Sequence, residues 1–319
     1  MTCAEGELAT LGKVGAGRES AGMDHKTFIQ ELPPEELAAL SRTEDRAGVL
    51  HLIGHGALIL GLGVWIAFGW PLWQLVLLPQ GIAICFLFTL VHETTHRTPF
   101  QNLTLNEWVG RAAGFAILLP LLWFRYFHLA HHRYTNLPGK DPELLAGAKP
   151  ETLRAYIWHI CGLPYWLGMA RQVIGNALGR DPGDYVPKPA TPRIAREARW
   201  MLVLYGLVAL SFAISQLLFW VWLLPALLGQ PFLRLYLLAE HGRCAPVANM
   251  FENTRTTYTG VVIRFLAWNM PYHVEHHTLP MVPFHRLPDL NTRMAAHLKV
   301  TAPGYGAFTK DYLTTLPKR

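Results

Sequence analysis

Charged residues are scarce in this sequence, and two long stretches have none at all. Only 16% of the 319 residues are Asp, Glu, Lys or Arg, against about 25% in an average soluble domain. None of these four residue types occurs from Ala47 to His92 or from Trp200 to Leu233. A membrane-spanning helix needs about 20 apolar residues, so each stretch has room for two spans. This pattern argues strongly against a soluble protein with buried helices.

Paired cysteines and a secretory leader are also lacking. The four cysteines form no C-x-x-C pair, and their spacing predicts neither a disulfide framework nor a thiolate metal site. A reducing compartment is the simple interpretation. Residues 1–22 have no apolar core, which excludes a signal peptide, and we expect this segment to be disordered. Translation starting at Met23 instead of Met1 remains open.

The uncharged stretches predict an all-α integral membrane protein with four transmembrane helices arranged as two hairpins. We expect spans at about 49–68, 72–91, 200–219 and 221–239, within a membrane domain of residues 47–300. Residues 1–46 form a cytoplasmic N-terminal segment and residues 301–319 a C-terminal tail. Two weaker apolar stretches, Ala112–Phe124 and Tyr156–Ile174, are expected to be helices that lie in the interface.

The basic residues predict the orientation. The loops that join the paired spans carry no Lys or Arg, so the positive-inside rule places the N-terminus and a helical cap on the cytoplasmic side of a multi-pass protein of the cytoplasmic membrane. The net charge is +6 and the pI about 9.2. This balance suits an anionic leaflet or an acidic redox partner. No interleaving of aromatic and basic residues indicates nucleic acid.

Histidine is the residue type present in excess, with 15 copies. Eight of them form three boxes: His92 and His96 in HETTH; His128, His131 and His132 in HLAHH; His273, His276 and His277 in HVEHH. Spacings of three and four residues put side chains on one helix face, so we expect each box to aim its rings at one point. All three boxes fall at cytoplasmic ends of the predicted topology. His241, at the inner end of the last span, is a ninth candidate.

The number of histidines predicts two metal ions. Imidazole suits iron, zinc and copper, and a single zinc takes three or four ligands. Eight or nine clustered ligands therefore exceed one ion. With iron, such a site reduces O2 to an oxidant able to attack an unactivated C–H bond. Glu93, Glu240 and Glu275 adjoin the histidines and are candidates to orient their rings.

The three boxes, in this order and with hairpins between them, resemble those of membrane fatty acid desaturases and their hydroxylase relatives. The segment from Arg264 through His277 to His285 also resembles the third-box region of bacterial members, and the resemblance covers roughly Val49 to Asp289. It implies two irons held by the box histidines, with a further histidine in the place of His241. An asparagine found four residues before that histidine in some acyl-CoA desaturases is Leu237 here.

The resemblance implies O2-dependent oxidation of a membrane lipid or acyl substrate, with desaturation as our working hypothesis. Hydroxylation of a membrane lipid or carotenoid by the same site is the alternative. No His-Pro-Gly-Gly motif of a fused cytochrome b5 is present. The electrons are therefore expected from a separate carrier of the ferredoxin, rubredoxin or cytochrome b5 type, with its reductase.

Two other functions were considered, and each explains fewer of the histidines. HETTH satisfies the H-E-x-x-H signature of zinc metalloproteases, which makes an intramembrane protease a distant alternative that leaves the other two boxes unexplained. A haem protein would place single histidines inside the spans, and it fits adjacent His-His pairs badly. Among the remaining residues, Arg234 lies within an apolar span and is a candidate substrate-binding residue. His51 and His55 are expected to be interfacial.

Overall fold

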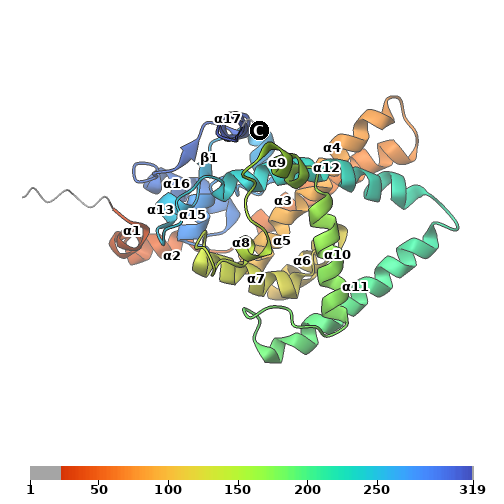
Figure 1. Ribbon diagram of the computed structural model, residues 1–319, viewed down its shortest axis with the longest axis horizontal. Helices are drawn as coiled ribbons and strands as arrows, with labels where there is room; N and C mark the ends of the chain where they lie inside the picture. Colours follow the sequence, from red (N-terminus) through yellow and green to blue (C-terminus); the bar gives the residue numbers. More distant parts are fainter. Residues whose placement is uncertain (1–22, 318–319) are drawn as a thin grey trace, which may run out of the picture.

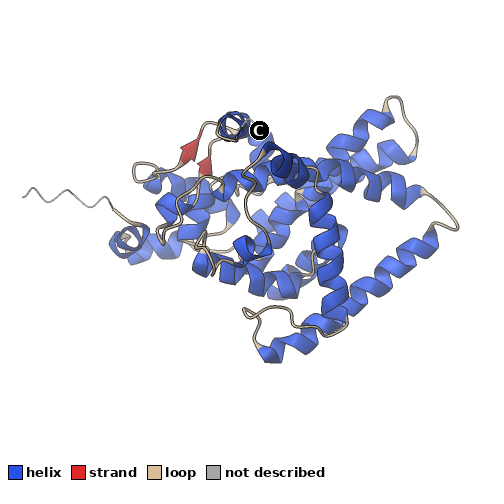
Figure 2. Ribbon diagram, in the orientation of Figure 1, coloured by secondary structure: helices blue, strands red, loops and turns tan. Residues whose placement is uncertain are grey.

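The computed structural model describes residues 23–317, and most of these residues are helical (Figure 2). The expectations for residues 1–22 lie outside the described residues. Figure 1 shows the arrangement of the elements. In chain order they are α1 (His25–Glu31), α2 (Pro34–Leu40), α3 (Asp45–Ala67), α4 (Trp73–Cys85), α5 (Leu87–His96), α6 (Leu103–Ala116), α7 (Leu121–Tyr134), α8 (Pro142–Ala146), α9 (Leu153–Ile160), α10 (Leu163–Ala177), η1 (Lys188–Ala190), α11 (Thr191–Ser211), η2 (Phe219–Leu223), α12 (Leu224–His241), α13 (Met250–Asn253), β1 (Thr256–Thr257), α14 (Val261–Leu266), α15 (His273–Thr278), η3 (Phe284–Arg286), α16 (Leu287–Met294), β2 (Thr301–Ala302) and α17 (Tyr305–Thr314).

Three helical segments are long and apolar enough to cross a membrane: Pro34–Ala67, Trp73–His96 and Phe219–His241. Large apolar side chains project outward from them; Leu60 on α3 and Leu75 on α4 are 71% and 70% exposed. Such exposure is expected where lipid, and not water, surrounds the helix. A fourth candidate is the pair α6 and α7, which pass the same test together but are bent by 97°. The chain thus has three candidate membrane-spanning helices, or four with the bent pair.

The third predicted span differs most from the structure. α11 begins at Thr191, before the uncharged stretch, and ends at Ser211. The chain then turns, and the Ser211 hydroxyl donates to the Val208 carbonyl at 2.7 Å while the Ser215 hydroxyl accepts from the backbone N–H of Leu217 at 3.1 Å. The predicted break after residue 219 is wrong, because the π-helical turn η2 (Phe219–Leu223) runs directly into α12.

Two glycines let α4 and α12 touch, and these helices run side by side in Figure 1. A Cβ on Gly81 would lie 1.8 Å from the Pro225 carbonyl oxygen, and a Cβ on Gly229 would lie 2.1 Å from the carbonyl carbon of Gly81. Small residues are what permits such close helix contact in a membrane. Because α5 continues from α4, this contact brings the end of α5 and the end of α12 to the same side of the molecule.

The bend between α6 and α7 returns the chain to that side. The Leu119 N–H donates to the Gly114 carbonyl at 2.7 Å, and Leu118 takes a left-handed conformation with φ of 60°. A Cβ on Gly114 would lie 2.3 Å from the Leu119 carbonyl oxygen, so the tight return requires glycine there. The second histidine box, on α7, is thereby placed beside the first.

Residues 301–317 belong to the segment predicted as a C-terminal tail, and they form β2 and α17. β2 pairs with β1 in parallel, with Thr256 opposite Thr301, and forms the only sheet among the described residues. α17 packs on α12 and α9, and the buried Tyr312 donates from its hydroxyl to the Pro150 carbonyl at 2.7 Å. The predicted helical class is confirmed apart from this short strand pair, and the C-terminal segment is part of the helical assembly.

Candidate metal centre

The nine predicted histidines lie together in two adjoining groups. In the first group, ring nitrogens of five histidines lie within 4.8 Å of one another: His92, His96, His128, His132 and His276. The same holds in the second group for His131, His241 and His277. His273 joins the second group, because its Nε2 lies 3.1 Å from Nε2 of both His241 and His277. Their role as metal ligands remains a prediction.

Boxes two and three each contribute to both groups, which corrects the expectation that a box aims all its rings at one point. On α7, His128 and His132 face the first group and His131 faces the second. On α15, His276 faces the first group, whereas His273 and His277 face the second. Neighbouring residues on a helix lie about 100° apart around its axis. The adjacent pairs in H-x-x-H-H are therefore divided between two sites.

The ring nitrogens fit a pair of cations. His241 has its Nδ1 3.1 Å from the Asn253 carbonyl oxygen, which can only accept, so Nδ1 carries the proton and Nε2 is a bare lone pair. His131 also carries a proton on Nδ1, which lies 2.9 Å from the Asp141 carboxylate. Its Nε2 lies only 3.2 Å from Nε2 of His241. With both rings neutral the two lone pairs repel each other, and either a cation between them or a second proton on His131 removes the repulsion.

Buried nitrogens without hydrogen-bond partners also indicate a metal site in the first group. Both ring nitrogens of His92 are buried and have no hydrogen-bond partner among the described residues. Nε2 of His128 lies 2.9 Å from Nε2 of His96 and 2.9 Å from Nε2 of His132. A neutral imidazole has one donor and one acceptor nitrogen, so these contacts cannot all be satisfied as hydrogen bonds. A bound metal ion would satisfy them, and imidazole-rich sites favour iron, zinc or copper.

Carboxyl groups lie behind several of the rings. Two of the three predicted ones lie near a ring without a hydrogen bond to it: the Glu240 carboxyl group is 3.4 Å from Nδ1 of His273, and that of Glu93 is 3.9 Å from Nδ1 of His276. Glu275 instead accepts hydrogen bonds from Thr256 and Asn291 and contacts no ring. Asp141, which follows box two in a loop, was missed because no sequence pattern indicates it.

Burial and hydrogen bonding set the protonation of the titratable groups at and around the histidines. Burial, reinforced by neighbouring histidines, lowers the pKa of His276 and His277 well below its usual value, so both rings are neutral near pH 7. Burial alone would raise the pKa of Asp141, but its hydrogen bond and charge interaction with His131 outweigh burial and leave that pKa lowered. Burial raises the pKa of Glu275. Neutral imidazoles backed by an ionised carboxylate form a suitable metal-binding set.

The protease alternative finds little support in the position of Glu93. Its side chain is fully buried, and one carboxylate oxygen accepts from the Thr98 hydroxyl at 2.8 Å and from the Phe284 N–H at 3.2 Å. A general base must instead reach a metal-bound water. Furthermore, His92 and His96 share their group with three other histidines.

Other sequence candidates lie apart from both groups. Arg234 is half-buried on α12, with its guanidinium 4.8 Å from the centre of the Tyr165 ring. His55 is fully buried, with Nε2 2.8 Å from the Ala83 carbonyl oxygen and Nδ1 accepting from the Trp268 indole at 3.1 Å. His51 has its Nε2 2.8 Å from the Phe265 carbonyl oxygen. The two histidines thus tie α3 to its neighbours.

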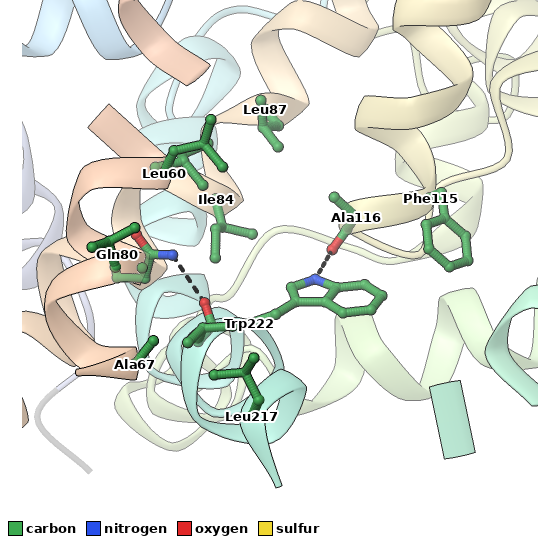
Figure 3. A pocket seen from close by; sticks show the side chains of 13 residues that line it. Leu60, Ala67, Gln80, Ile84, Leu87, Phe115, Ala116, Leu217 and Trp222 are labelled. Atoms are coloured by element: carbon green, nitrogen blue, oxygen red, sulfur yellow. Dashed lines mark hydrogen bonds between the residues drawn. The ribbon is translucent and has the colours of Figure 1, made fainter. Parts of the chain in front are cut away.

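Two apolar cavities lie among the helices that carry the histidines. One, of about 460 Å³, is an open cavity lined by residues of α3, α4, α5, α6 and η2. Figure 3 shows two hydrogen bonds at this cavity: Gln80 donates to the Val221 carbonyl and the Trp222 indole to the Ala116 carbonyl, at 2.9 and 2.8 Å. The other, of about 990 Å³, lies between α4, α12, α14 and α17. Tyr236 lines it, one helical turn before Glu240, so this cavity approaches the second histidine group.

Comparison with known proteins identifies the family. A family model described as fatty acid desaturase matches residues 67–309. The chain is 27% identical over 205 residues to a sphingolipid delta(4)-desaturase/C4-monooxygenase of Mus musculus, covering 62% of this chain and 58% of that protein. It is 29% identical over 242 residues to a sphingolipid delta(4)-desaturase of Drosophila melanogaster, covering 72% and 68%.

A third relative, a sphingolipid delta(4)-desaturase-like protein of Oryza sativa subsp. japonica, is 26% identical over 206 residues, which cover 63% of this chain and 57% of that protein. The chain thus spans less than two thirds of the length of the mouse and rice relatives. The family model, in contrast, covers most of the chain and all three histidine boxes. The chain belongs to the fatty acid desaturase family.

Proposed function

We propose that this chain is a membrane-bound di-iron enzyme that uses O2 to desaturate the hydrocarbon chain of a lipid. The convergence of nine histidine rings into two adjoining groups carries the proposal. In such a reaction a –CH2–CH2– unit loses two hydrogens. These hydrogens, together with two electrons and two protons from outside, reduce one O2 to two waters. When bound, iron would supply the redox chemistry that activates O2 toward an unactivated C–H bond.

The residues of the chain position the rings and keep the site dry. Asp141 and the Asn253 carbonyl accept from the Nδ1 atoms of His131 and His241 and so direct their Nε2 atoms inward. The Thr135 hydroxyl lies 3.1 Å from Nδ1 of His277 and supports that ring in the same way. Such outer contacts raise ligand basicity and fix ring orientation. Burial of seven of the nine rings excludes water from most of the site.

The cavity of about 990 Å³ supports a membrane lipid as the substrate. α4 and α12, which belong to candidate membrane-spanning helices, form part of its wall and would give a hydrocarbon chain access from the bilayer. The cavity lies along α12 within about two turns of His241, a distance of roughly 10 Å. The sphingolipid desaturases among the relatives favour a long-chain lipid with a polar head of the sphingolipid type. Arg234, a cation on this same helix, is proposed to contact the polar head of that lipid.

Hydroxylation is the second candidate, because the mouse relative is named as both a delta(4)-desaturase and a C4-monooxygenase. Both outcomes begin with removal of one hydrogen from the chain and differ in the second step. Desaturation removes a hydrogen from the neighbouring carbon, whereas hydroxylation inserts an oxygen atom at the first. The same histidine groups serve both reactions.

The distribution of basic residues supports a cytoplasmic position for the N-terminus and the three boxes. The proposed topology has two helical hairpins. The first joins α3 to α4 and α5, and the second pairs α12 with α11, which is not one of the three long apolar segments; the short outer turns contain no Lys or Arg. The proposed membrane domain comprises residues 47–300. Electrons would come from a separate carrier of the ferredoxin, rubredoxin or cytochrome b5 type with its reductase.

Lipid mass spectrometry of a host with and without the gene tests the proposal. A lipid lighter by two hydrogens is the result expected for desaturation, and a lipid heavier by one oxygen would assign hydroxylation. The variants His131→Ala and His276→Ala remove one ring from each group and should abolish the change. His285→Ala, which alters a histidine outside both groups, is the matched control. A product that persists in both ring variants would contradict the proposal.

A further inference from the structure

The two histidine groups differ in their exposure. Seven of the nine rings are buried, and only His96 and His132 are half-buried. Both belong to the first group, and their ring centres lie 4.6 Å apart. Of the nine histidines, His96 and His132 are therefore the ones nearest to the molecular surface, although Nδ1 of His132 is itself buried.

An exposed arginine directly follows each of these histidines. Arg97 follows His96, and its side chain is 54% exposed with only a long ion pair of 3.7 Å to Glu107. Arg133 follows His132, is exposed, and forms no ion pair among the described residues. An exposed arginine thus adjoins each of the two half-buried histidines along the chain.

The positive region continues beyond Arg97. A cavity of about 350 Å³ beside it is also lined by Arg111, Arg125 and Arg193. Glu107 pairs with Arg125 at 2.7 Å and with Arg111 at 3.2 Å, and Glu197 also pairs with Arg111 at 3.2 Å, so these two glutamates neutralise part of the charge of the arginines. The cavity walls hold four arginines and one glutamate. An anionic partner that approaches this part of the surface therefore meets a favourable field.

An exposed apolar residue lies between the charges. Leu129 is 45% exposed on α7, one turn from both Arg125 and Arg133 and next to the turn that carries His132. An apolar centre with a charged surround is the usual composition of a protein docking surface. We define the arginine-rimmed surface by its five residues, His96, Arg97, Leu129, His132 and Arg133.

The second group lies beside carboxyl groups instead. Asp141 and Glu143 lie near its His131 and Glu240 lies near its His273, but Asp141 and Glu240 are buried, so only Glu143 of these three, with its side chain 42% exposed, faces the surface. Charge therefore attracts an acidic partner to the arginine-rimmed surface. Charge of this kind decides where and how fast a partner docks more than how tightly it binds.

We propose that the arginine-rimmed surface is the docking site of a small acidic one-electron carrier. This inference rests on the proposed function, which requires two electrons from outside for each turnover. The carrier is oxidised by one electron in each encounter, and two encounters supply the pair. Because electron transfer slows steeply with distance, the partner must approach where the rings lie nearest to the surface. Weak redox encounters bury less than about 1,200 Å² in total, so a small surface is sufficient.

Binding of a defined probe to the purified, iron-loaded protein tests the proposal. The probe is an acidic [2Fe–2S] ferredoxin, and basic cytochrome c is the control for charge. We expect ferredoxin affinity to fall steeply with added salt. The variants Arg97→Glu and Arg133→Glu should each weaken ferredoxin binding about tenfold and slow the ferredoxin-driven reduction of the centre, and cytochrome c should not bind the wild type. Arg133→Gln should show a smaller loss in the same direction.

Arg154→Glu is the matched control, because Arg154 is an exposed arginine on α9 outside this surface. It should bind ferredoxin as the wild type does. Iron content and reduction by dithionite are measured in every variant, so that a folding defect is recognised. If Arg97→Glu and Arg133→Glu bind ferredoxin as tightly as Arg154→Glu, the docking proposal is wrong.

Other outcomes separate this inference from the proposed function. If both variants lose affinity for vesicles of anionic phosphatidylglycerol but bind ferredoxin normally, the surface contacts lipid head groups and the docking proposal is overturned. If the wild type holds iron and oxidises lipid with a chemical reductant, yet the variants behave as the wild type with ferredoxin, only the docking proposal fails. A wild type that binds no iron would instead contradict the proposed function itself.

Discussion

The carboxylate of Asp141 lies 2.9 Å from Nδ1 of His131, and Nε2 of the same ring lies 3.2 Å from Nε2 of His241. A loop residue thus holds a helix residue so that its second nitrogen faces a ring from another helix. Asp141 itself is held in place, because it also accepts from the backbone N–H groups of Asn136 and Glu143 at 2.7 and 2.9 Å. This arrangement gives a direct test of the second group.

Replacing Asp141 should weaken metal binding without removing a ligand. In Asp141→Asn the charge that supports His131 is lost, and metal affinity should fall roughly 10- to 100-fold, the usual effect of losing such a contact. Chelator competition on the purified protein measures this change. Glu143→Gln is the control, because that carboxylate is 3.4 Å from the same nitrogen and 42% exposed. Equal affinities in the two variants would show that Asp141 does not support the ring.

Because box two is divided between the groups, replacing His131 or His132 should each leave a protein that binds one metal ion, but at a different site. His131→Ala removes a nitrogen from the group of four, and His132→Ala removes one from the group of five. Each variant should keep mainly one ion, held by about five nitrogens in His131→Ala and about four in His132→Ala. X-ray absorption spectroscopy of the remaining metal measures that number. Identical coordination in both would mean that the boxes are not divided as the structure indicates.

The three boxes could be predicted from the sequence because their spacing is local. His92 and His96, four residues apart, must share a helix face whatever the rest of the fold does. The division of His131 and His132 could not be predicted, because it depends on how α5, α7, α12 and α15 pack together. Asp141 lies in a loop, where no periodic signal indicates a function.

The helix boundaries in residues 200–233 could not be predicted from the sequence, for a different reason. This stretch is apolar and uncharged throughout, so hydropathy alone does not locate the turn within it. The hydroxyls of Ser211 and Ser215 bond to nearby backbone groups at the turn. After the turn, the Trp222 indole donates to the Ala116 carbonyl on α6. Long-range packing of this kind has no local signal in the sequence.

The contact between α4 and α12 should be sensitive to any side chain at Gly81. Gly81→Val would force the helices apart, because a Cβ there already overlaps the Pro225 carbonyl. We expect a loss of about 1–3 kcal/mol or more in stability, together with a loss of metal, since α5 and α12 both carry histidines. Thermal unfolding in detergent provides the measurement.

Gly206→Val on α11 is the control for that experiment, because nothing lies within 4 Å of a Cβ at that position. It should unfold near the wild-type temperature. Should the two glycine variants unfold alike, the close helix contact would not be what positions the histidines.

Arg234 should affect substrate binding more than metal binding. If its guanidinium contacts the polar head of the lipid, Arg234→Met should raise the KM about tenfold, corresponding to loss of a charged hydrogen bond of about 1.5 kcal/mol. Iron content and kcat should stay close to wild type. Arg234→Lys, which keeps the charge, should recover part of the affinity. A lower unfolding temperature with an unchanged KM would show that the residue acts only through its contact with Tyr165.

The iron-to-protein ratio of the purified chain, measured with zinc in the same samples, tests the central claim most directly. Five and four histidine nitrogens in two groups predict about two irons per chain and little zinc. That ratio should fall in His131→Ala and His132→Ala and stay unchanged in His285→Ala. One zinc per chain, with no iron in protein produced under iron-replete conditions, would contradict the di-iron account and return HETTH to the protease alternative.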